Sequence, residues 1–255
     1  MTSITPRAAA RYRARWDRQQ ERYIPDREER FSALVGLLGA AVPARARVLD
    51  LGCGTGSLTE RVLHELPRAR VVAIDRDPVL LALARSGLGS RNGRVLWVDA
   101  DLRSKGWAAA LPRGRFDAAI SSTALHWLSA EELGRLYRIL AKRLRPGGVL
   151  LNADAIASGR TTPQLRRILL RAARRRARRS RPPGGESWRS FWRAALSDPR
   201  LATEAALHRE RFPTDHQRTR TADLPGHVLR LRRAGFREVG VVWSRGRSRI
   251  LAAVR

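Results

Sequence analysis

Few folds accommodate an apolar run that leads straight into three alternating glycines, and this chain has one at residues 48–56, VLDLGCGTG. The run ends in Gly52, Gly54 and Gly56, and an amphipathic segment begins directly after them. Glycine permits positive φ and lets a ligand lie against the main chain. In open α/β sheets, ligands bind beyond the carboxyl ends of the strands, at turns of this kind. The glycine loop is therefore the first candidate for a binding site.

The segment after the loop is expected to be a helix. Ser57 with Glu60 three residues later has the spacing of a capping box. Unpaired N–H groups in the first turn of a helix attract negative groups such as a phosphate or a carboxylate. The dinucleotide-binding fingerprint requires a third glycine where this chain has Ser57, counted from Gly52, or Thr59, counted from Gly54. The fingerprint therefore fails in both registers.

The rest of the chain alternates short apolar runs with amphipathic segments, which is typical of a βαβ series. Expected strands lie at 47–51, 71–74, 94–98, 116–121 and 149–153, and a closing antiparallel pair at 238–243 and 249–254. Near-continuous apolar strands indicate a parallel sheet that is covered on both faces. The sequence therefore predicts an α/β fold with a doubly wound, Rossmann-like, seven-stranded sheet, mostly parallel with the last strand antiparallel.

Basic residues dominate the composition, with a formal net charge of +28. Such a charge favours polyanions in general, because Lys and Arg release counterions from phosphate backbones. Only Lys105 and Lys142 are lysines, however, and this arginine bias is interpreted mainly as a solubility feature. The excess is local: residues 161–200 hold twelve arginines against Glu186 and Asp198. A solvated basic helix is the default interpretation, with carboxylate clamps or RNA contacts as alternatives.

Five segments, in order and at family spacing, resemble the class I S-adenosylmethionine-dependent methyltransferases, in particular the trans-aconitate methyltransferase-like group. They are VLDLGCGTG (48–56), VVAIDRDP (71–78), VLWVDADL (95–102), FDAAISSTALHWL (116–128) and LRPGGVLL (144–151). The resemblance is strong over residues 45–155 and weaker over the closing strands. It implies S-adenosylmethionine as the cofactor and S-adenosylhomocysteine as the product.

The resemblance also implies roles for residues around the glycine loop. Asp50 would help to hold the methionine end of the cofactor, and Ser121 would line the methionine portion. The backbone at Gly52, Cys53 and Gly54 would pack on the cofactor. Gly56 would open the following helix.

A second group of residues would hold the ribose and the adenine. The resemblance implies that Asp75 accepts hydrogen bonds from both ribose hydroxyls, as a carboxylate can. Arg76 would lie beside the adenine, and Asp101 would receive the adenine amino group, with the Leu102 backbone nearby. Asp99 is an alternative to Asp101, and Asp77 before Pro78 is expected to cap a helix.

The acceptor site is less defined by the sequence. In-line transfer of a methyl group from a sulfonium requires that the acceptor atom is held close to the methyl carbon and that water is excluded. A hydroxyl acceptor also needs a general base, whereas a carboxylate acceptor does not. His126 is the candidate catalytic residue. Tyr23, Arg27, Arg30 and Trp127 are candidate acceptor-site residues, with ordinary packing or surface roles as the alternative. No metal is expected, because the histidines lack ligand spacing.

The expected domain organisation is one domain over residues 1–255. Its four parts are an N-terminal helical cap (1–44), a cofactor-binding core (45–155), a helical Arg-rich insertion (156–222), and a closing helix and strands (223–255). Within the cap, a second helix is expected to start at Asp26, with Glu29 as its capping partner. The single cysteine excludes an internal disulfide and fits the cytoplasm, and no apolar run suits a membrane.

Three functions remain open from the sequence. Methyl transfer to a small-molecule acceptor, a carboxylate or a hydroxyl, is favoured. The alternatives are a nucleic-acid methyltransferase that uses the Arg-rich insertion, and a non-enzymatic polyanion-binding module on the same fold. SSTA after the fourth expected strand is not the Asn/Asp-Pro-Pro-aromatic motif of amino-methylating nucleic-acid enzymes.

Overall fold

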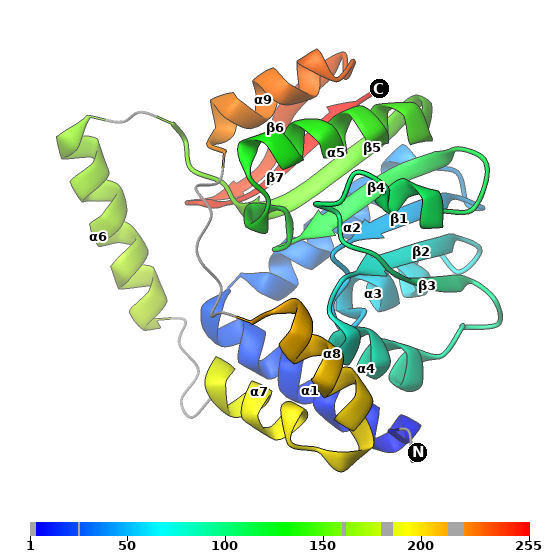
Figure 1. Cartoon of the computed structure of the whole chain (residues 1–255). Coiled ribbons are helices and arrows are strands. Elements are labelled where there is room, and N and C mark those ends of the chain that lie inside the picture. The colour runs from blue at the N-terminus through cyan, green and yellow to red at the C-terminus, as the bar shows by residue number, and fades with distance from the viewer. Residues whose placement is uncertain (1–3, 25, 160–161, 180–185, 214–221) are drawn as a thin grey trace.

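The computed structural model describes residues 4–24, 26–159, 162–179, 186–213 and 222–255. Its centre is a seven-stranded sheet of order β3-β2-β1-β4-β5-β7-β6 (Figure 1). The strands are β1 (Arg47–Leu51), β2 (Arg70–Asp75), β3 (Val95–Asp99), β4 (Phe116–Ser122), β5 (Leu144–Ala155), β6 (Glu238–Arg245) and β7 (Ser248–Val254). β7 runs antiparallel between β5 and β6, and the other strands are parallel to one another. The predicted fold class is confirmed.

The strand order reverses beside β1, because β2 pairs with one of its edges and β4 with the other. Val48, Leu49 and Leu51 of β1 have no exposed surface, as expected for a central strand with both faces covered. A ligand of a doubly wound sheet binds at such a reversal, outside the carboxyl ends of the strands. The segments that follow β1 and β4 therefore meet where a ligand is expected.

Helices cover both faces of the sheet (Figure 1). On one face, α2 (Arg27–Ala41) and α3 (Ser57–Glu65) bury Phe31, Leu34 and Val62 against the sheet. On the other face, α5 (Ala130–Arg143) and α9 (Leu224–Arg233) bury Leu136 and Leu231. Short 3₁₀ turns lie at Trp107–Ala110 and Leu125–Trp127.

A third apolar cluster joins segments that are far apart in the sequence. It contains Tyr12 from α1 (Pro6–Tyr23), Leu83 from α4 (Pro78–Leu88), and Phe191 and Trp192 from α7 (Trp188–Leu196). After α7 come a 3₁₀ turn at Pro199–Leu201 and α8 (Ala202–Arg211). The N-terminal helix and the second half of the insertion therefore share one core.

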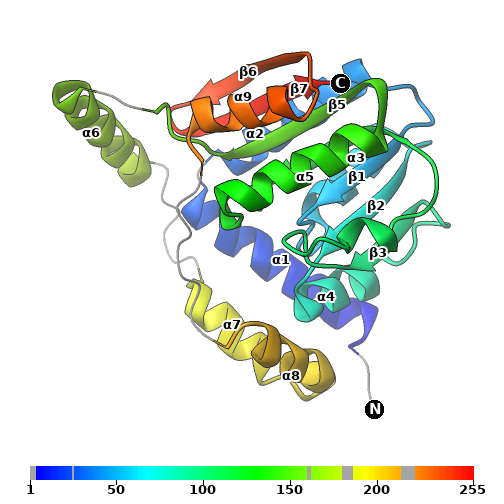
Figure 2. The same ribbon diagram turned by 45° about the horizontal axis from the view of Figure 1, so that its top comes forward.

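Helix α6 (Pro163–Arg179), the first half of the insertion, lies apart from the body of the molecule in both views (Figures 1 and 2). Leu165, Ile168, Leu169 and Leu170 are all exposed. The arginines of α6 whose side chains the structure describes are exposed as well.

Two predicted capping boxes and one predicted strand start are wrong. The N-cap of α3 is Gly56 at φ 80°, and Ser57 and Glu60 form no capping box, because both side chains bind other segments. Asp26 is the N-cap of α2 without a side-chain cap, and Glu29 pairs with Arg245 instead. β5 begins at Leu144, before the expected Pro-Gly-Gly turn, because Leu144 already pairs with Phe116.

Candidate active site

The three glycines after β1 are required for three different reasons. Gly52 lies at φ 72°, and a Cβ there would overlap the Cβ of Ala124 in the segment after β4. Gly56, at φ 80°, packs under Trp97, whose ring would lie 2.7 Å from an added Cβ. Gly54, at φ 54°, faces open space, since an added Cβ would meet only Leu80 at 4.0 Å. The loop is therefore packed at both ends and bare in the middle, as a main-chain cradle must be.

Asp75, at the end of β2, is held beside this cradle by backbone groups. Its Oδ2 accepts a hydrogen bond from the Gly54 N–H at 2.7 Å, and its Oδ1 accepts one from the Asp77 N–H at 2.9 Å. Burial raises the pKa of Asp75 to about 6. Each carboxylate oxygen has a second lone pair, so the group can still receive a diol.

Asp50 and Ser121 lie deeper than the cradle. Asp50 is 1% exposed, and its carboxylate accepts a hydrogen bond from the Thr59 hydroxyl at 2.6 Å. Burial raises the pKa of Asp50 to about 7. Ser121 has no exposed surface and donates to the Leu51 carbonyl at 2.8 Å. Both side chains therefore fix the carboxyl ends of β1 and β4 under the loop.

Cys53 contributes its backbone to the loop. Its N–H, like that of Gly52, donates to the Ile74 carbonyl at the end of β2. The Cys53 side chain is buried, and burial raises the pKa of its thiol well above the usual value.

A pocket at the ends of β2 and β3 is lined by Arg76, Asp99, Asp101 and Arg211, among others. Arg76 lies 3.1 Å from Asp101, and Arg211 lies 2.6 Å from Asp99. Both candidate adenine carboxylates therefore face one pocket. The side chain of Leu102, beside Asp101, packs on the core.

The end of α8, in the insertion, forms part of the wall of this pocket, which sequence reasoning missed. The Arg76 guanidinium lies 4.2 Å from the Phe212 ring centre and donates to the Arg211 carbonyl. His208 of α8 binds Asp77 at 2.9 Å. Asp77 also caps α4 by accepting from the Val79 and Leu80 N–H groups, as predicted. No pattern in the sequence links α8 to β2, because the contact depends on how the insertion folds back.

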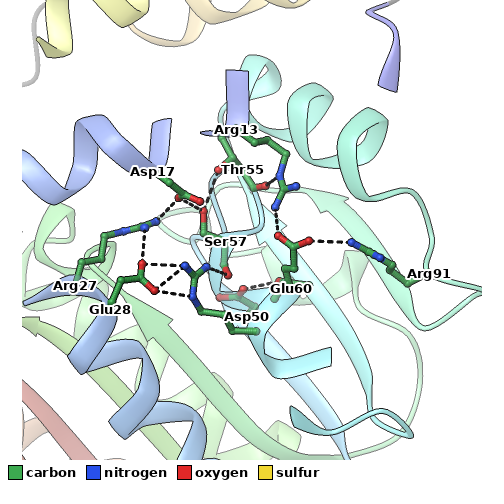
Figure 3. A network of polar contacts seen from close by, with 11 residues as sticks. Arg13, Asp17, Arg27, Glu28, Asp50, Thr55, Ser57, Glu60 and Arg91 are labelled. Atoms are coloured by element: carbon green, nitrogen blue, oxygen red, sulfur yellow. Dashed lines mark hydrogen bonds and ion pairs between the residues drawn. The ribbon is translucent and has the colours of Figure 1, made fainter. Parts of the chain in front are cut away.

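The N-terminal helices are tied to the glycine loop by a polar network (Figure 3). Arg13 of α1 donates to the Thr55 carbonyl at 2.8 Å and pairs with Glu60 at 2.6 Å. Asp17 of α1 accepts hydrogen bonds from Ser57 and Arg27. Sequence reasoning missed Arg13 and Asp17, whose only signal was a charged helix.

The candidate acceptor residues separate into two groups. His126 and Trp127 lie together after β4, with ring centres 4.8 Å apart. Tyr23 is exposed at the end of α1, and its hydroxyl accepts from the Trp188 N–H. Arg27 is 4% exposed and held in its ion pair with Asp17.

Arg30 is the largest fully buried side chain in the described structure. Its guanidinium donates to Ser122 and Ser248 at 3.2 and 3.4 Å. Burial lowers its pKa to about 10, so the group stays charged at neutral pH.

His126 has a partner that sequence reasoning did not identify. Its Nδ1 lies 2.9 Å from Oδ1 of Asp154, near the carboxyl end of β5, and its backbone N–H donates to Oδ2. Asp154 is 2% exposed, whereas a third of the His126 side chain is accessible. An acidic residue in an apolar strand was the only signal.

Residues 48–148 match the family model described as a methyltransferase domain. This part of the chain, residues 48–148, carries the methyltransferase domain. The trans-aconitate 2-methyltransferase of Azoarcus sp. (strain BH72) is 39% identical to it over 137 residues, which cover 53% of this chain and 49% of that protein. The malonyl-[acyl-carrier protein] O-methyltransferase of Paenibacillus sp. (strain JDR-2) is 33% identical over 110 residues, or 41% of this chain and 37% of that protein.

The chain thus spans about half the length of these curated relatives, or less. Human N-acetylserotonin methyltransferase in complex with S-adenosylmethionine shares the fold, with a TM-score of 0.53 at 17% identity over 96% of this chain and 57% of that chain. That structure holds S-adenosylmethionine, the cofactor that the sequence motifs of this chain imply.

The residues present fit this cofactor. A bare cradle at Gly54 suits an extended chain that lies against the backbone, and Asp75 beside it suits a ribose diol. Within the described ranges, no group of three His, Cys, Asp or Glu side chains could hold a metal ion, and no helix is long and apolar enough to cross a membrane.

Proposed function

We propose that the protein transfers a methyl group from S-adenosylmethionine to a small-molecule acceptor. The observation that carries this proposal is the contact between Asp75 and Gly54, which joins a ribose-binding carboxylate to an open main-chain cradle. A glycine turn alone is an ordinary tight turn. A glycine turn whose open centre is bonded to a half-buried carboxylate on the next strand supports the assignment of a nucleoside site.

Each site residue then has a role toward the cofactor. Asp75 would bind both ribose hydroxyls, and Asp101, with Arg76 and Leu102 beside it, would hold the adenine. The backbone of Gly52, Cys53 and Gly54 would support the methionine portion. Asp50 and Ser121 would keep the strand ends in place below it, and Gly56 would start α3. When bound, the cofactor supplies an activated methyl group; the chain positions the acceptor and excludes water.

The small-molecule class of the acceptor is supported by the relatives, whose names specify trans-aconitate and malonyl-[acyl-carrier protein]. The N-terminal helices and the insertion would form the walls around the acceptor within one domain. Trp127, beside His126, would line that site; Tyr23 and Arg27 would act on it through the N-terminal helices. The single cysteine, buried and unpaired, supports a cytoplasmic setting.

The binding step is tested by calorimetry with S-adenosylmethionine and S-adenosylhomocysteine. Asp75→Ala should weaken both ligands by at least about 100-fold, because two charge-assisted hydrogen bonds are lost. Glu65→Ala, an exposed carboxylate at the end of α3, is the matched control and should bind as the parent protein does. Unchanged binding by Asp75→Ala would remove the proposed ribose ligand.

The transfer step is tested by S-adenosylhomocysteine release with a panel of small acids and phenols. Methylation of RNA in place of these acceptors would favour the nucleic-acid alternative, in which the arginines of α6 contact phosphates. Salt titration of RNA binding gives a second measure of that alternative, since phosphate contacts produce a steep dependence on salt. Ligand binding without any transfer would favour the non-enzymatic module.

A further inference from the structure

Asp154 fixes the protonation pattern of His126. Burial alone would raise the pKa of Asp154, but the hydrogen bonds and charge of His126, the Ala155 N–H and the charge of Arg30 outweigh burial and hold it below its usual value. An ionised carboxylate can only accept hydrogen bonds, so the Nδ1 that faces it carries the proton. In its neutral form, the imidazole therefore has its lone pair on Nε2, which is the arrangement of a general base.

The groups around Asp154 keep this arrangement stable. Arg30 from α2 provides a buried positive charge, and His126 provides the direct hydrogen bond. From α5 and α9, Tyr137 and His227 form a separate pair at 2.7 Å. Burial raises the pKa of Tyr137 and lowers that of His227, so both stay neutral near pH 7.

The position of His126 relative to the glycine loop is also defined. Ala124, two residues before it, is the residue that a Cβ on Gly52 would overlap. The segment that carries His126 therefore packs directly on the loop that we assign to the cofactor. Trp127, 39% exposed, adds an accessible aromatic face beside the imidazole.

A base in this position limits the chemistry of the acceptor. A carboxylic acid is already ionised at neutral pH and gains nothing from a base. An alkyl alcohol is far less acidic than a phenol, so its oxygen carries less negative charge for the same hydrogen bond to a histidine. A phenol, with a pKa of about 10, lies close enough for proton transfer to histidine to assist the reaction. An aromatic ring also suits the exposed face of Trp127.

We propose that the acceptor is a phenol whose proton is taken by Nε2 of His126, with Asp154 as the positioning residue. This inference rests on the proposed function. The phenolic O–H bond breaks as the proton passes to Nε2, and the oxygen forms its new bond to the methyl carbon. The carbon–sulfur bond breaks with its electron pair left on sulfur. The products are an aryl methyl ether and neutral S-adenosylhomocysteine, and the imidazolium returns its proton to water.

The first experiment compares acceptors that differ in one group. The wild-type chain with S-adenosylmethionine is given para-substituted phenols and the benzoates that carry a carboxyl group in place of the hydroxyl. S-adenosylhomocysteine release should be at least about tenfold faster with the phenols. Transfer to benzoates alone, equal transfer to both, or no transfer to any phenol would overturn the inference. Binding of S-adenosylmethionine is measured by calorimetry in the same preparation. If the cofactor binds, any of these outcomes overturns the phenol inference alone; if it does not bind, the proposed function fails as well.

The second experiment tests the base itself. His126→Ala should lower kcat for the phenol by about 100-fold or more and remove the rise of kcat with pH, because general-base catalysis is lost. Added imidazole should restore part of kcat. Affinity for S-adenosylmethionine should stay within about threefold. His64→Ala, an exposed histidine on α3, is the control and should match the parent.

Asp154→Asn tests the positioning role. An amide can donate to Nδ1 and so favours the tautomer with its proton on Nε2, which cannot act as a base. We expect kcat to fall by about 10-fold to 1,000-fold with a changed pH profile, whereas KM for the phenol changes little. If Asp154→Asn fails to fold, His126→Ala still tests the proposal. A full kcat with an unchanged pH profile in His126→Ala contradicts the proposal.

Discussion

Asp17 of α1 and Ser57 in the first turn of α3 are joined by a hydrogen bond of 2.6 Å from the Ser57 hydroxyl to Oδ1 of Asp17. The same oxygen accepts a hydrogen bond from Arg27 of α2 at 2.7 Å (Figure 3). One carboxylate therefore connects three helices and lies at the N-terminus of α3, where negative charge is favourable. The glycine loop is covered at this point by a charged contact from the N-terminal segment.

This contact predicts that Asp17→Ala destabilises the fold by about 2 kcal/mol, because it leaves the 4% exposed Arg27 with its longer contact to Glu28 as the remaining ion pair in the described structure. The free energy of unfolding from urea titration is the measurement. Glu131→Ala, which breaks an exposed i,i+4 pair with Arg135, is the control and should cost under about 0.5 kcal/mol. Equal losses in the two variants would show that the Asp17 contact is an ordinary surface pair.

The glycine loop gives a second prediction. Gly52→Ala should cost about 2 to 4 kcal/mol, since the backbone lies at φ 72° and the new Cβ overlaps Ala124. Gly36→Ala in α2, where nothing lies within 4 Å, should be neutral or slightly stabilising. Gly54→Ala has room for its Cβ, so it should cost only about 1 to 2 kcal/mol for its φ of 54° and should also weaken the affinity for S-adenosylmethionine. Thermal unfolding and calorimetry together separate these effects.

The pH dependence of stability should report on Asp50. Its folded pKa of about 7 exceeds the ordinary value, so the folded chain binds more protons than the unfolded chain between about pH 4 and pH 7. This contribution to stability is therefore lost as pH rises through 7. Asp50→Asn removes it, and the variant should gain about 5 to 10 °C in Tm on the parent between pH 5 and pH 8.

Other groups titrate in the same window but remain in both proteins. Burial raises the pKa of Asp75 to about 6, and it lowers the pKa of His227, with the opposite effect on stability. The comparison is therefore made as the difference between parent and variant, by scanning fluorimetry without cofactor. Parallel curves for the two proteins would contradict the assignment of this proton to Asp50.

The insertion should be coupled to the cofactor site through His208. This side chain binds Asp77 and stacks between Trp192 and Phe212, with ring centres 4.5 and 4.7 Å away. His208→Ala should speed amide hydrogen exchange in α7 and α8 and weaken S-adenosylmethionine binding several-fold. Exchange in α2 and α5 should not change. Faster exchange without a change in affinity would mean that the insertion is a separate unit.

The strand pattern predicted the sheet correctly, and the glycine motif predicted the turn after β1, because both depend on local sequence. Apolar runs specify buried parallel strands, and glycines at positive φ specify where the chain turns. The predicted capping boxes were wrong for a physical reason. Ser57, Glu60 and Glu29 have the spacing of caps, but each side chain binds an arginine or an aspartate from a distant segment.

The site contacts that the sequence did not predict share one property: each joins segments that are far apart in the chain. Asp154 on β5 reaches His126, which follows the neighbouring strand β4, and Arg211 reaches Asp99 from the end of α8. Neither contact has a fixed spacing in sequence. In contrast, Ser129 and Glu132 do form a capping box at the start of α5, where no distant group competes for them.

The separation of α6 from the body makes it the natural place for a protease to cut. Arg167, Arg171, Arg174 and Arg175 are exposed on a helix that packs against little else (Figure 2). A single tryptic cut there would divide the chain into two fragments. Those fragments should stay associated and folded, because β7 remains paired inside the sheet with β5 and Phe191 remains buried against Tyr12.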